Sequence, residues 1–150
     1  ESSKQMIKNI KWYLGRIPNA NTQVIMGQIN LDISADESYK YERGITVSGT
    51  NVASWIGKVG LIYPSDVLYT YENGADISTA WLTKDEALWS ITATSSSTQD
   101  VYSIRKGLLY LQYGYFAGNA LDVYPSVYLS PSVKIISGTG TSDDPYQLNQ

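Results

Sequence analysis

The chain of 150 residues contains no cysteine and no histidine. The lack of cysteine excludes disulfide bonds and Cys–His catalysis. The lack of histidine excludes Ser–His–Asp triads and acid–base chemistry by an imidazole. Zinc sites built from cysteine and histidine are excluded as well, so we expect no metal site of that kind.

Charged residues are also scarce, at 17% of the chain against the usual ~25%, and the formal net charge is −3. Nucleic-acid binding needs basic patches that neutralise phosphates, but the single adjacent basic pair is Arg105–Lys106. No apolar run is long enough to cross a membrane as a helix. We therefore expect no nucleic-acid partner, and membrane contact only through a segment upstream of Glu1.

Aromatic residues are plentiful but unevenly chosen, with 13 tyrosines and 4 tryptophans against 1 phenylalanine. Tyrosine and tryptophan combine a large apolar ring with a polar group, which suits half-exposed sheet faces and contact surfaces. Serine, threonine, asparagine and glutamine supply much of the remaining polarity. This balance is typical of secreted and surface proteins, so we expect an extracellular or cell-surface location. The length fits one domain, and we take residues 1–150 as a single globular surface domain.

Apolar side chains recur at helical spacing near the start of the chain, which predicts an amphipathic helix over residues 3–14. Short apolar segments between turn signals predict strands, above all at 55–63, 88–93, 101–104, 108–115, 124–129 and 133–136. We expect the last two to close a sheet against Trp55–Lys58. Residues 36–43 give no clear signal, and residues 67–71 are expected to form a short strand or turn. The predicted fold class is α+β, a β-dominated single domain with an N-terminal amphipathic helix.

Three carboxylates are candidates for chemistry. Asp66 follows a predicted strand, Asp122 precedes another, and Glu86 lies in a charged loop. Two carboxylates about 5–10 Å apart can hydrolyse a glycosidic bond, but nothing in the sequence indicates that these side chains meet. Because aspartate beside a turn usually caps backbone groups, we assign them structural roles and expect no catalytic residue.

Three further features bear on metals, cofactors and covalent links: an aspartate pair, glycine-rich segments, and lysines that could form an amide crosslink. The Asp143–Asp144 pair does not have the spacing of an EF-hand loop, so we interpret it as a hairpin tip and predict no metal, although a Ca²⁺ site is left open. The glycine-rich segments lack the ending of a phosphate-binding loop, so we predict no cofactor. Lys58 or Lys134 with Asn119 or Asp122 are eligible residue types for an amide crosslink, an alternative that the sequence also leaves open.

Exposed aromatic rings stack on sugars and anchor protein interfaces. The tryptophans lie in or beside predicted elements, and tyrosines recur along 108–115. We take as candidate ligand-binding residues Trp55, Trp81, Trp89, Tyr110 and Tyr113. The candidate partners are a glycan, a host or cell-surface protein, and copies of the chain itself.

Several phrases in a fixed order carry a family resemblance. They include KWYLG (Lys11–Gly15), SWIGKVGLIYPSD (Ser54–Asp66) and the closing VYPSVYLSPSVKIISGTGTSDDPYQL (Val123–Leu148). The chain resembles the C-terminal globular domains of Gram-positive extracytoplasmic, prepilin-like proteins. It has a more distant likeness to C-type-lectin-like domains. The resemblance implies display at the cell surface or on a pilus, with ligand binding and no reaction.

The leading hypothesis is therefore a non-enzymatic cell-surface or pilus-associated display and binding module, a pilin-like or adhesin-like head with a C-type-lectin-like fold. The first alternative is a structural, self-assembling pilin subunit. The second alternative is a carbohydrate-active enzyme that uses Asp66, Asp122 or Glu86.

Overall fold

The computed structural model describes residues 5–17, 24–25, 28–29, 34–44, 52–72, 88–94, 100–104, 115–116, 120–141 and 143–149. Its helices are α2 (Ala35–Glu42) and α3 (Pro64–Glu72). Its strands are β1 (Ile10–Tyr13), β2 (Arg16–Ile17), β3 (Val24–Ile25), β4 (Gln28–Ile29), β5 (Ser54–Gly57), β6 (Val59–Leu61), β7 (Leu88–Thr94), β8 (Asp100–Ile104), β9 (Tyr115–Phe116), β10 (Pro125–Val127), β11 (Lys134–Ser137) and β12 (Gln147–Asn149). The domain is thus mixed α+β and dominated by strands, as expected.

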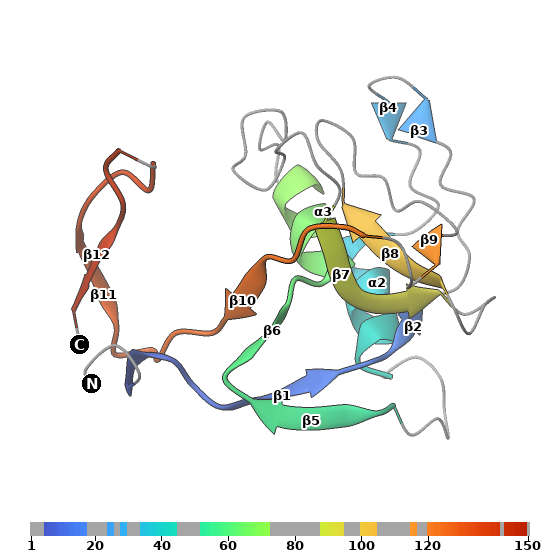
Figure 1. Ribbon diagram of the computed structural model, residues 1–150, viewed down its shortest axis with the longest axis horizontal. Helices are drawn as coiled ribbons and strands as arrows, with labels where there is room; N and C mark the ends of the chain where they lie inside the picture. Colours follow the sequence, from blue (N-terminus) through green and yellow to red (C-terminus); the bar gives the residue numbers. More distant parts are fainter. Residues whose placement is uncertain are drawn as a thin grey trace.

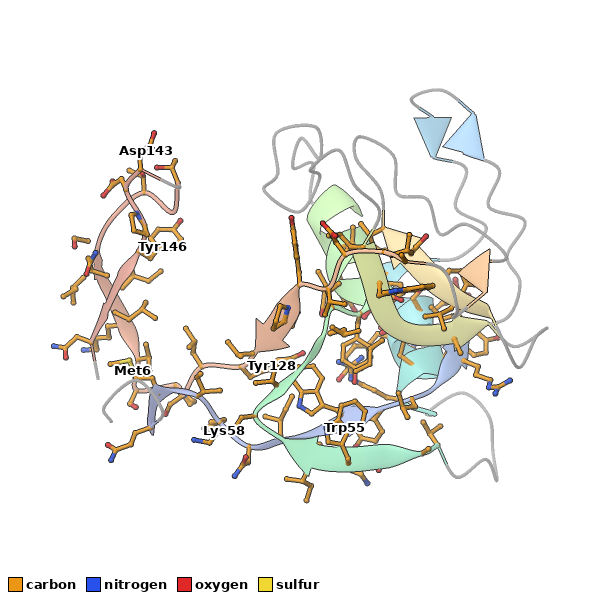
Figure 2. The ribbon with its side chains drawn as sticks, viewed as in Figure 1. Met6, Trp55, Lys58, Tyr128, Asp143 and Tyr146 are labelled. Carbon is orange, nitrogen blue, oxygen red and sulfur yellow. The ribbon has the colours of Figure 1, made fainter. Side chains whose placement is uncertain are left out.

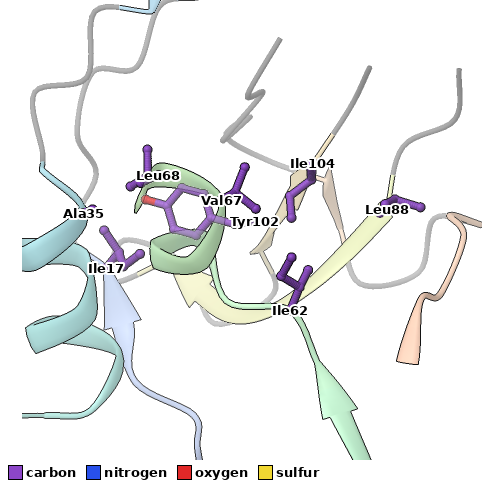
Figure 3. Packing of buried hydrophobic residues seen from close by; sticks show 8 residues of the cluster. All are labelled: Ile17, Ala35, Ile62, Val67, Leu68, Leu88, Tyr102 and Ile104. Carbon is purple, nitrogen blue, oxygen red and sulfur yellow. The ribbon is translucent and has the colours of Figure 1, made fainter. Parts of the chain in front are cut away.

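The largest sheet has the strand order β2-β7-β8-β9, with β2 parallel to β7 and the other pairs antiparallel. Helices α2 and α3 pack on each other beside this sheet (Figure 1). The main apolar core lies between the two helices and the sheet (Figure 3). Its buried members are Ile17, Ala35, Ile62, Val67, Leu68, Leu88, Tyr102 and Ile104. We refer to this sheet with its two helices as the body.

Helix α2 occupies a segment in which the sequence was read as having no clear preference. Ser34 is its N-cap and forms a complete capping box: its side chain accepts the Glu37 N–H, and the Glu37 carboxylate accepts the Ser34 N–H. The box satisfies two backbone donors that an open helix end would leave exposed. The Ser-x-x-Glu spacing was the local signal for this helix.

Helix α3 corrects the expectation of a short strand or turn over residues 67–71. Pro64 begins the helix, where its fixed φ is favourable and its missing N–H costs nothing. The Asp66 carboxylate accepts the N–H of Tyr63 at 3.3 Å, just before the first turn. The Pro-Ser-Asp sequence, read as the end of a strand, is therefore the start of a helix.

The prediction of an N-terminal helix over residues 3–14 is wrong for residues 10–13, which form a strand. Gln5 and Met6 are helical, but residues 10–13 form β1, and residues 1–4 lie outside the described residues. Strand β1 pairs antiparallel with β5, with Trp12 directly opposite Trp55. The partner strand satisfies the backbone groups of β1, and successive side chains then alternate, so that Lys11 is exposed while Trp12 is buried.

Three segments that are distant in sequence, residues 6–13, 54–61 and 125–130, meet at one junction, below and to the left of the body in Figure 1. Strand β1 pairs with β5, and β6 pairs with β10. The third side is closed by residues 6–8 and 128–130, through an antiparallel bridge between Ile7 and Leu129. Two backbone bonds hold that bridge, from the Lys8 N–H to the Tyr128 carbonyl at 2.9 Å and from the Ser130 N–H to the Met6 carbonyl at 2.7 Å. Each segment therefore pairs with both of the others.

Strands β11 and β12 form an antiparallel hairpin that stands apart from the body, beside both chain ends (Figure 1). The expectation that both closing strands would pair with Trp55–Lys58 is wrong, because β5 pairs with β1, β10 pairs with the neighbouring β6, and β11 pairs with β12. The hairpin loop depends on Gly138 and Gly140, whose φ angles of 91° and 81° disfavour other residues. Asp144 ties the loop, accepting the Thr139 N–H at its carboxylate, 2.9 Å away. The predicted hairpin tip at Asp143–Asp144 is thus confirmed. Among the described residues, no helix is long and apolar enough to cross a membrane.

Candidate functional site

An aromatic stack lies where the three-segment junction meets the body. Trp12 is fully buried at its centre, and its ring is nearly parallel to those of Trp55, at 6.2 Å, and Tyr63, at 6.1 Å. Tyr128 meets Trp12 edge-on at 5.5 Å. The Trp12 Nε1–H donates to the Gly57 carbonyl at 3.0 Å, so the indole has its polar group satisfied.

Gly60 allows this stack to close. A Cβ at that position would lie 2.4 Å from Trp12 Cε3, far inside van der Waals contact. The strand β6 backbone can therefore approach the indole face only without a side chain at this residue. Packing against Trp12 therefore explains Gly60, the second glycine of the Trp-Ile-Gly-Lys-Val-Gly sequence.

Tyr63 connects the stack to the helices. Its hydroxyl accepts the Tyr13 N–H at 2.8 Å and donates to the Tyr13 carbonyl at 3.2 Å. Burial raises the pKa of Tyr63, so the hydroxyl stays neutral and keeps its donor role. The Arg43 guanidinium lies over the Tyr63 ring at 4.5 Å and over the Tyr39 ring at 3.8 Å. Such cation–π contacts hold the long arginine side chain in one place.

Glu42 is the buried acid of this site. It accepts two hydrogen bonds from Ser65, from the backbone N–H at 2.9 Å and from the hydroxyl at 2.5 Å, and it lies 3.3 Å from Arg43 NH1. Burial raises the pKa of Glu42 to about 7, against the lowering effects of the Ser65 hydrogen bonds and of Arg43. The carboxyl therefore fastens the end of α2 to the first turn of α3, and it does so without reaching solvent.

The outer side of this network presents rings to solvent. Trp55 is 38% exposed, Tyr128 39% and Tyr39 37%, and Asp66 is also exposed. Burial of part of the side chain, followed by the nearby Asp66 charge, raises the pKa of Tyr128, and Arg43 opposes this by hydrogen bonding. Figure 2 labels Trp55 and Tyr128 at the junction, where both rings contact Trp12. We call Tyr39, Arg43, Trp55, Asp66 and Tyr128 the aromatic surface.

The aromatic surface combines flat rings with polar groups. The rings offer flat apolar faces, while Arg43, Asp66 and the Tyr128 hydroxyl offer hydrogen bonds. Asp66 keeps a raised pKa because neighbouring groups displace part of its hydration, even though it remains exposed. Its carboxylate is also committed to the start of α3. In the part of the chain that the structure describes, no group of three or more acidic, Cys or His side chains could hold a metal ion.

The structure describes two of the five predicted ligand-binding residues, Trp55 and Trp89. Trp55 lies in the aromatic surface, where it is 38% exposed. Trp89 lies half-buried on β7 in the body sheet. Its backbone N–H donates to the Asp122 carbonyl at 3.0 Å. Trp55 lies on β5 and Trp89 on β7, and these strands belong to different sheets. Strand pairing therefore does not bring the two rings into one platform. Trp81, Tyr110 and Tyr113 lie outside the described residues.

The candidate carboxylates occupy separate elements. Asp66 caps α3, and Asp122 bridges Leu88 at the start of β7, while Glu86 lies outside the described residues. Of the crosslink candidates, Lys58 and Lys134 are exposed and Asp122 is half-buried, while Asn119 lies outside the described residues.

Tyr39, Arg43 and Tyr128 of the aromatic surface were not singled out from the sequence. They come from α2, from the residue after it and from the segment after β10, and no local spacing links them. A weak signal was available for Tyr39 and Arg43, since an i, i+4 pair shares one face of a helix or its continuation. That signal required recognising α2 first.

Comparisons of this chain with protein-family models, with curated proteins and with solved structures found no match.

Proposed function

We propose that this domain is a non-enzymatic binding module displayed at the cell surface or on a pilus, and that its ligand is a glycan held on the aromatic surface. The extracellular location and the C-type-lectin-like fold are part of the same proposal. They are supported by the family resemblance of the Ser54–Asp66 and Val123–Leu148 phrases and are compatible with the mixed α+β architecture. No reaction is proposed.

The observation that carries the proposal is the supported exposure of Trp55. A single exposed apolar side chain is ordinary at a protein surface, whereas a ring held rigidly in place offers a preformed contact to a ligand. The Trp55 ring is not a loose surface side chain, because it stacks on the fully buried Trp12, which is itself tied to Gly57. A ring already held in place loses little conformational entropy when a ligand stacks on it.

The local charge favours a neutral, hydroxyl-rich ligand. Arg43 is the cation of the site, but the acids Glu42 and Asp66 lie close to it and both lower the net positive potential. A strongly anionic ligand would meet Asp66, and a strongly cationic one would meet Arg43. A sugar can instead stack on Trp55 and exchange hydrogen bonds with both polar groups.

A glycan array followed by titration calorimetry tests the proposal. We expect binding of at least one neutral glycan by the 150-residue chain and an affinity loss of at least tenfold on Trp55→Ala. The matched control is Tyr146→Ala, which removes an exposed ring from the hairpin and should leave the affinity unchanged.

Two outcomes count against the proposal. The absence of any glycan signal, with binding to a cell-surface protein instead, would reject the ligand class. Glycan hydrolysis that disappears in Asp66→Asn would reject the non-enzymatic reading in favour of a carbohydrate-active enzyme.

A further inference from the structure

The β11–β12 hairpin exposes several large apolar side chains. Every residue of β11 is exposed, with Ile135 at 60% and Ile136 at 63%, and Tyr146 next to β12 is exposed as well. The register shifts between Ile135 and Ser137, so both isoleucines lie at an irregularity of the strand and both are exposed. A lone two-stranded hairpin is marginally stable in water, and a further layer is needed to stabilise it.

The hairpin ends in negative charge. Asp143 and Asp144 are exposed at its tip, and residues 135–149 contain no lysine or arginine. Lys134 at the start of β11 is the sole basic residue of the hairpin, residues 134–149. The outer half of the hairpin therefore combines exposed isoleucine and tyrosine with an acidic tip.

The paired strands β1 and β5, with Lys58 after them, have the opposite character. Lys11 lies directly opposite Ile56 in the register, and both residues are exposed, Ile56 at 75%. Lys58 is exposed two positions beyond Ile56. Residues 5–15 and 52–61 contain no aspartate or glutamate. We call Lys11, Ile56 and Lys58 the basic ribbon, which combines an exposed isoleucine with two exposed lysines.

We propose that the β11–β12 hairpin of one copy docks on the basic ribbon of a second copy. The two surfaces match in apolar character and are opposite in charge, which favours their association over contact of two like surfaces. The hairpin points away from the ribbon of its own chain (Figure 1). Its root is held by a turn in which the Val133 N–H donates to the Ser130 carbonyl at 2.9 Å. The ribbon of another copy is therefore the matching surface within reach.

This contact joins two different surfaces, so each copy carries one hairpin that can dock and one ribbon that can receive the hairpin of another copy. Such head-to-tail contacts build closed rings or open chains. The inference goes beyond the proposed glycan binding and does not depend on it. Ile56 and Trp55 are successive residues of β5 and point to opposite faces, so one face can bind a ligand while the other binds a copy.

Light scattering of the 150-residue chain across a concentration series provides the test. We expect a mass above that of the monomer that rises with concentration at low salt. The mass should fall at about 1 M salt, where the screening length is only ~3 Å. Ile135→Asp/Ile136→Asp in the hairpin and Ile56→Asp in the ribbon should each give monomers. Val123→Asp, an exposed apolar position outside both surfaces, is the matched control and should still associate.

Mixing the two monomeric variants decides the geometry. The intact ribbon of the hairpin variant should capture the intact hairpin of the ribbon variant, giving a dimer. Asp143→Lys mixed with Lys11→Glu should likewise associate better than either variant does alone. Circular dichroism checks that each variant keeps the fold, which we expect because the changed side chains are exposed.

Three results would overturn the inference. A monomeric wild-type chain at every concentration would remove the self-contact, and association that survives both sets of aspartate substitutions would place it elsewhere. Monomers that fail to form a dimer on mixing would show that the hairpin of one copy does not dock on the ribbon of another. Glycan affinity, read separately through Trp55, stays unaffected by all three.

Discussion

The body and the hairpin use the same kinds of side chain in opposite ways. Ile104 on β8 is almost completely buried, whereas Ile135 on β11 is largely exposed. Both isoleucines lie on strands in antiparallel pairs. The difference is that the body sheet is covered by α2 and α3, whereas no described element packs across the β11–β12 hairpin (Figures 1 and 3). Strand propensity therefore makes a strand, and a second layer makes a core.

The same comparison applies to the polar groups. In the body, Glu42 is buried and joined to Ser65 and Arg43. In the hairpin, Asp144 ties its own loop through Thr139 and remains exposed. Carboxylates thus connect different elements in one region and fold a single turn in the other. Each region should respond to mutation and to pH in its own way.

Core truncation should separate the two regions most strongly. Leu68→Ala removes a fully buried side chain of α3 and should lower the free energy of unfolding by about 2–5 kcal/mol. Ile136→Ala in the hairpin should change it by less than about 0.5 kcal/mol, because that side chain is exposed. Urea denaturation of dilute protein measures both. Equal effects would mean that the hairpin shares a packed core with the body.

The pH dependence of stability should come from the body through Glu42. Its pKa is about 7 in the folded chain and 4.5 as the reference value, so the folded state holds a proton that the unfolded state releases. The stabilisation is complete at low pH and is lost as the pH rises through about 7. We expect the unfolding free energy to fall by up to about 3 kcal/mol from this group.

Glu42→Gln keeps the shape and removes the titration, so its unfolding free energy should stay nearly level between about pH 5 and 8. Glu37→Gln is the control on the same helix, because hydrogen bonding to Ser34 lowers the pKa of Glu37 and this exposed group titrates outside that range. Denaturation curves across this pH range measure the slope. Parallel pH profiles for wild type and Glu42→Gln would contradict the assignment.

Loss of a cap should give the smallest effect and sharpen the comparison further. Ser34→Ala removes the capping box of α2 and should cost about 1 kcal/mol of global stability. Thr141→Ala removes the hydroxyl that accepts the Asp144 N–H at 3.1 Å in the hairpin loop. That change should leave global stability unaltered and speed amide exchange in the loop alone. Hydrogen exchange measured residue by residue distinguishes the two, and a global effect of Thr141→Ala would be unexpected.

Several strands could be predicted because their signal is local. Residues 88–93, 101–104 and 133–136 combine apolar runs with nearby turn residues, and they form β7, β8 and β11. The predicted strand 55–63 is a strand only through Leu61, and it divides at Lys58 into β5 and β6, which pair with different partners. That division could not be predicted, because it is imposed by two partner strands far away in the sequence.

The helices and the site were harder for a related reason. Helices α2 and α3 are short, so their caps carried more information than their periodicity did. Periodicity pointed the wrong way at residues 10–13, where helical spacing lost to pairing with β5. Of the aromatic surface, Trp55 could be expected from residue type, whereas Tyr39, Arg43 and Tyr128 depend on contacts between four segments.

The sequence by itself determined the strand-rich class, the turn at Asp143–Asp144 and the exclusion of cysteine and histidine chemistry, because each follows from composition or from neighbouring residues. Tertiary structure alone decided that Trp12 is buried while Trp55 is half-exposed. It also decided that Glu42 is an interior acid and that the closing hairpin stands away from the body. These outcomes depend on which distant segments cover a side chain, and burial, unlike strand propensity, is a property of the whole fold.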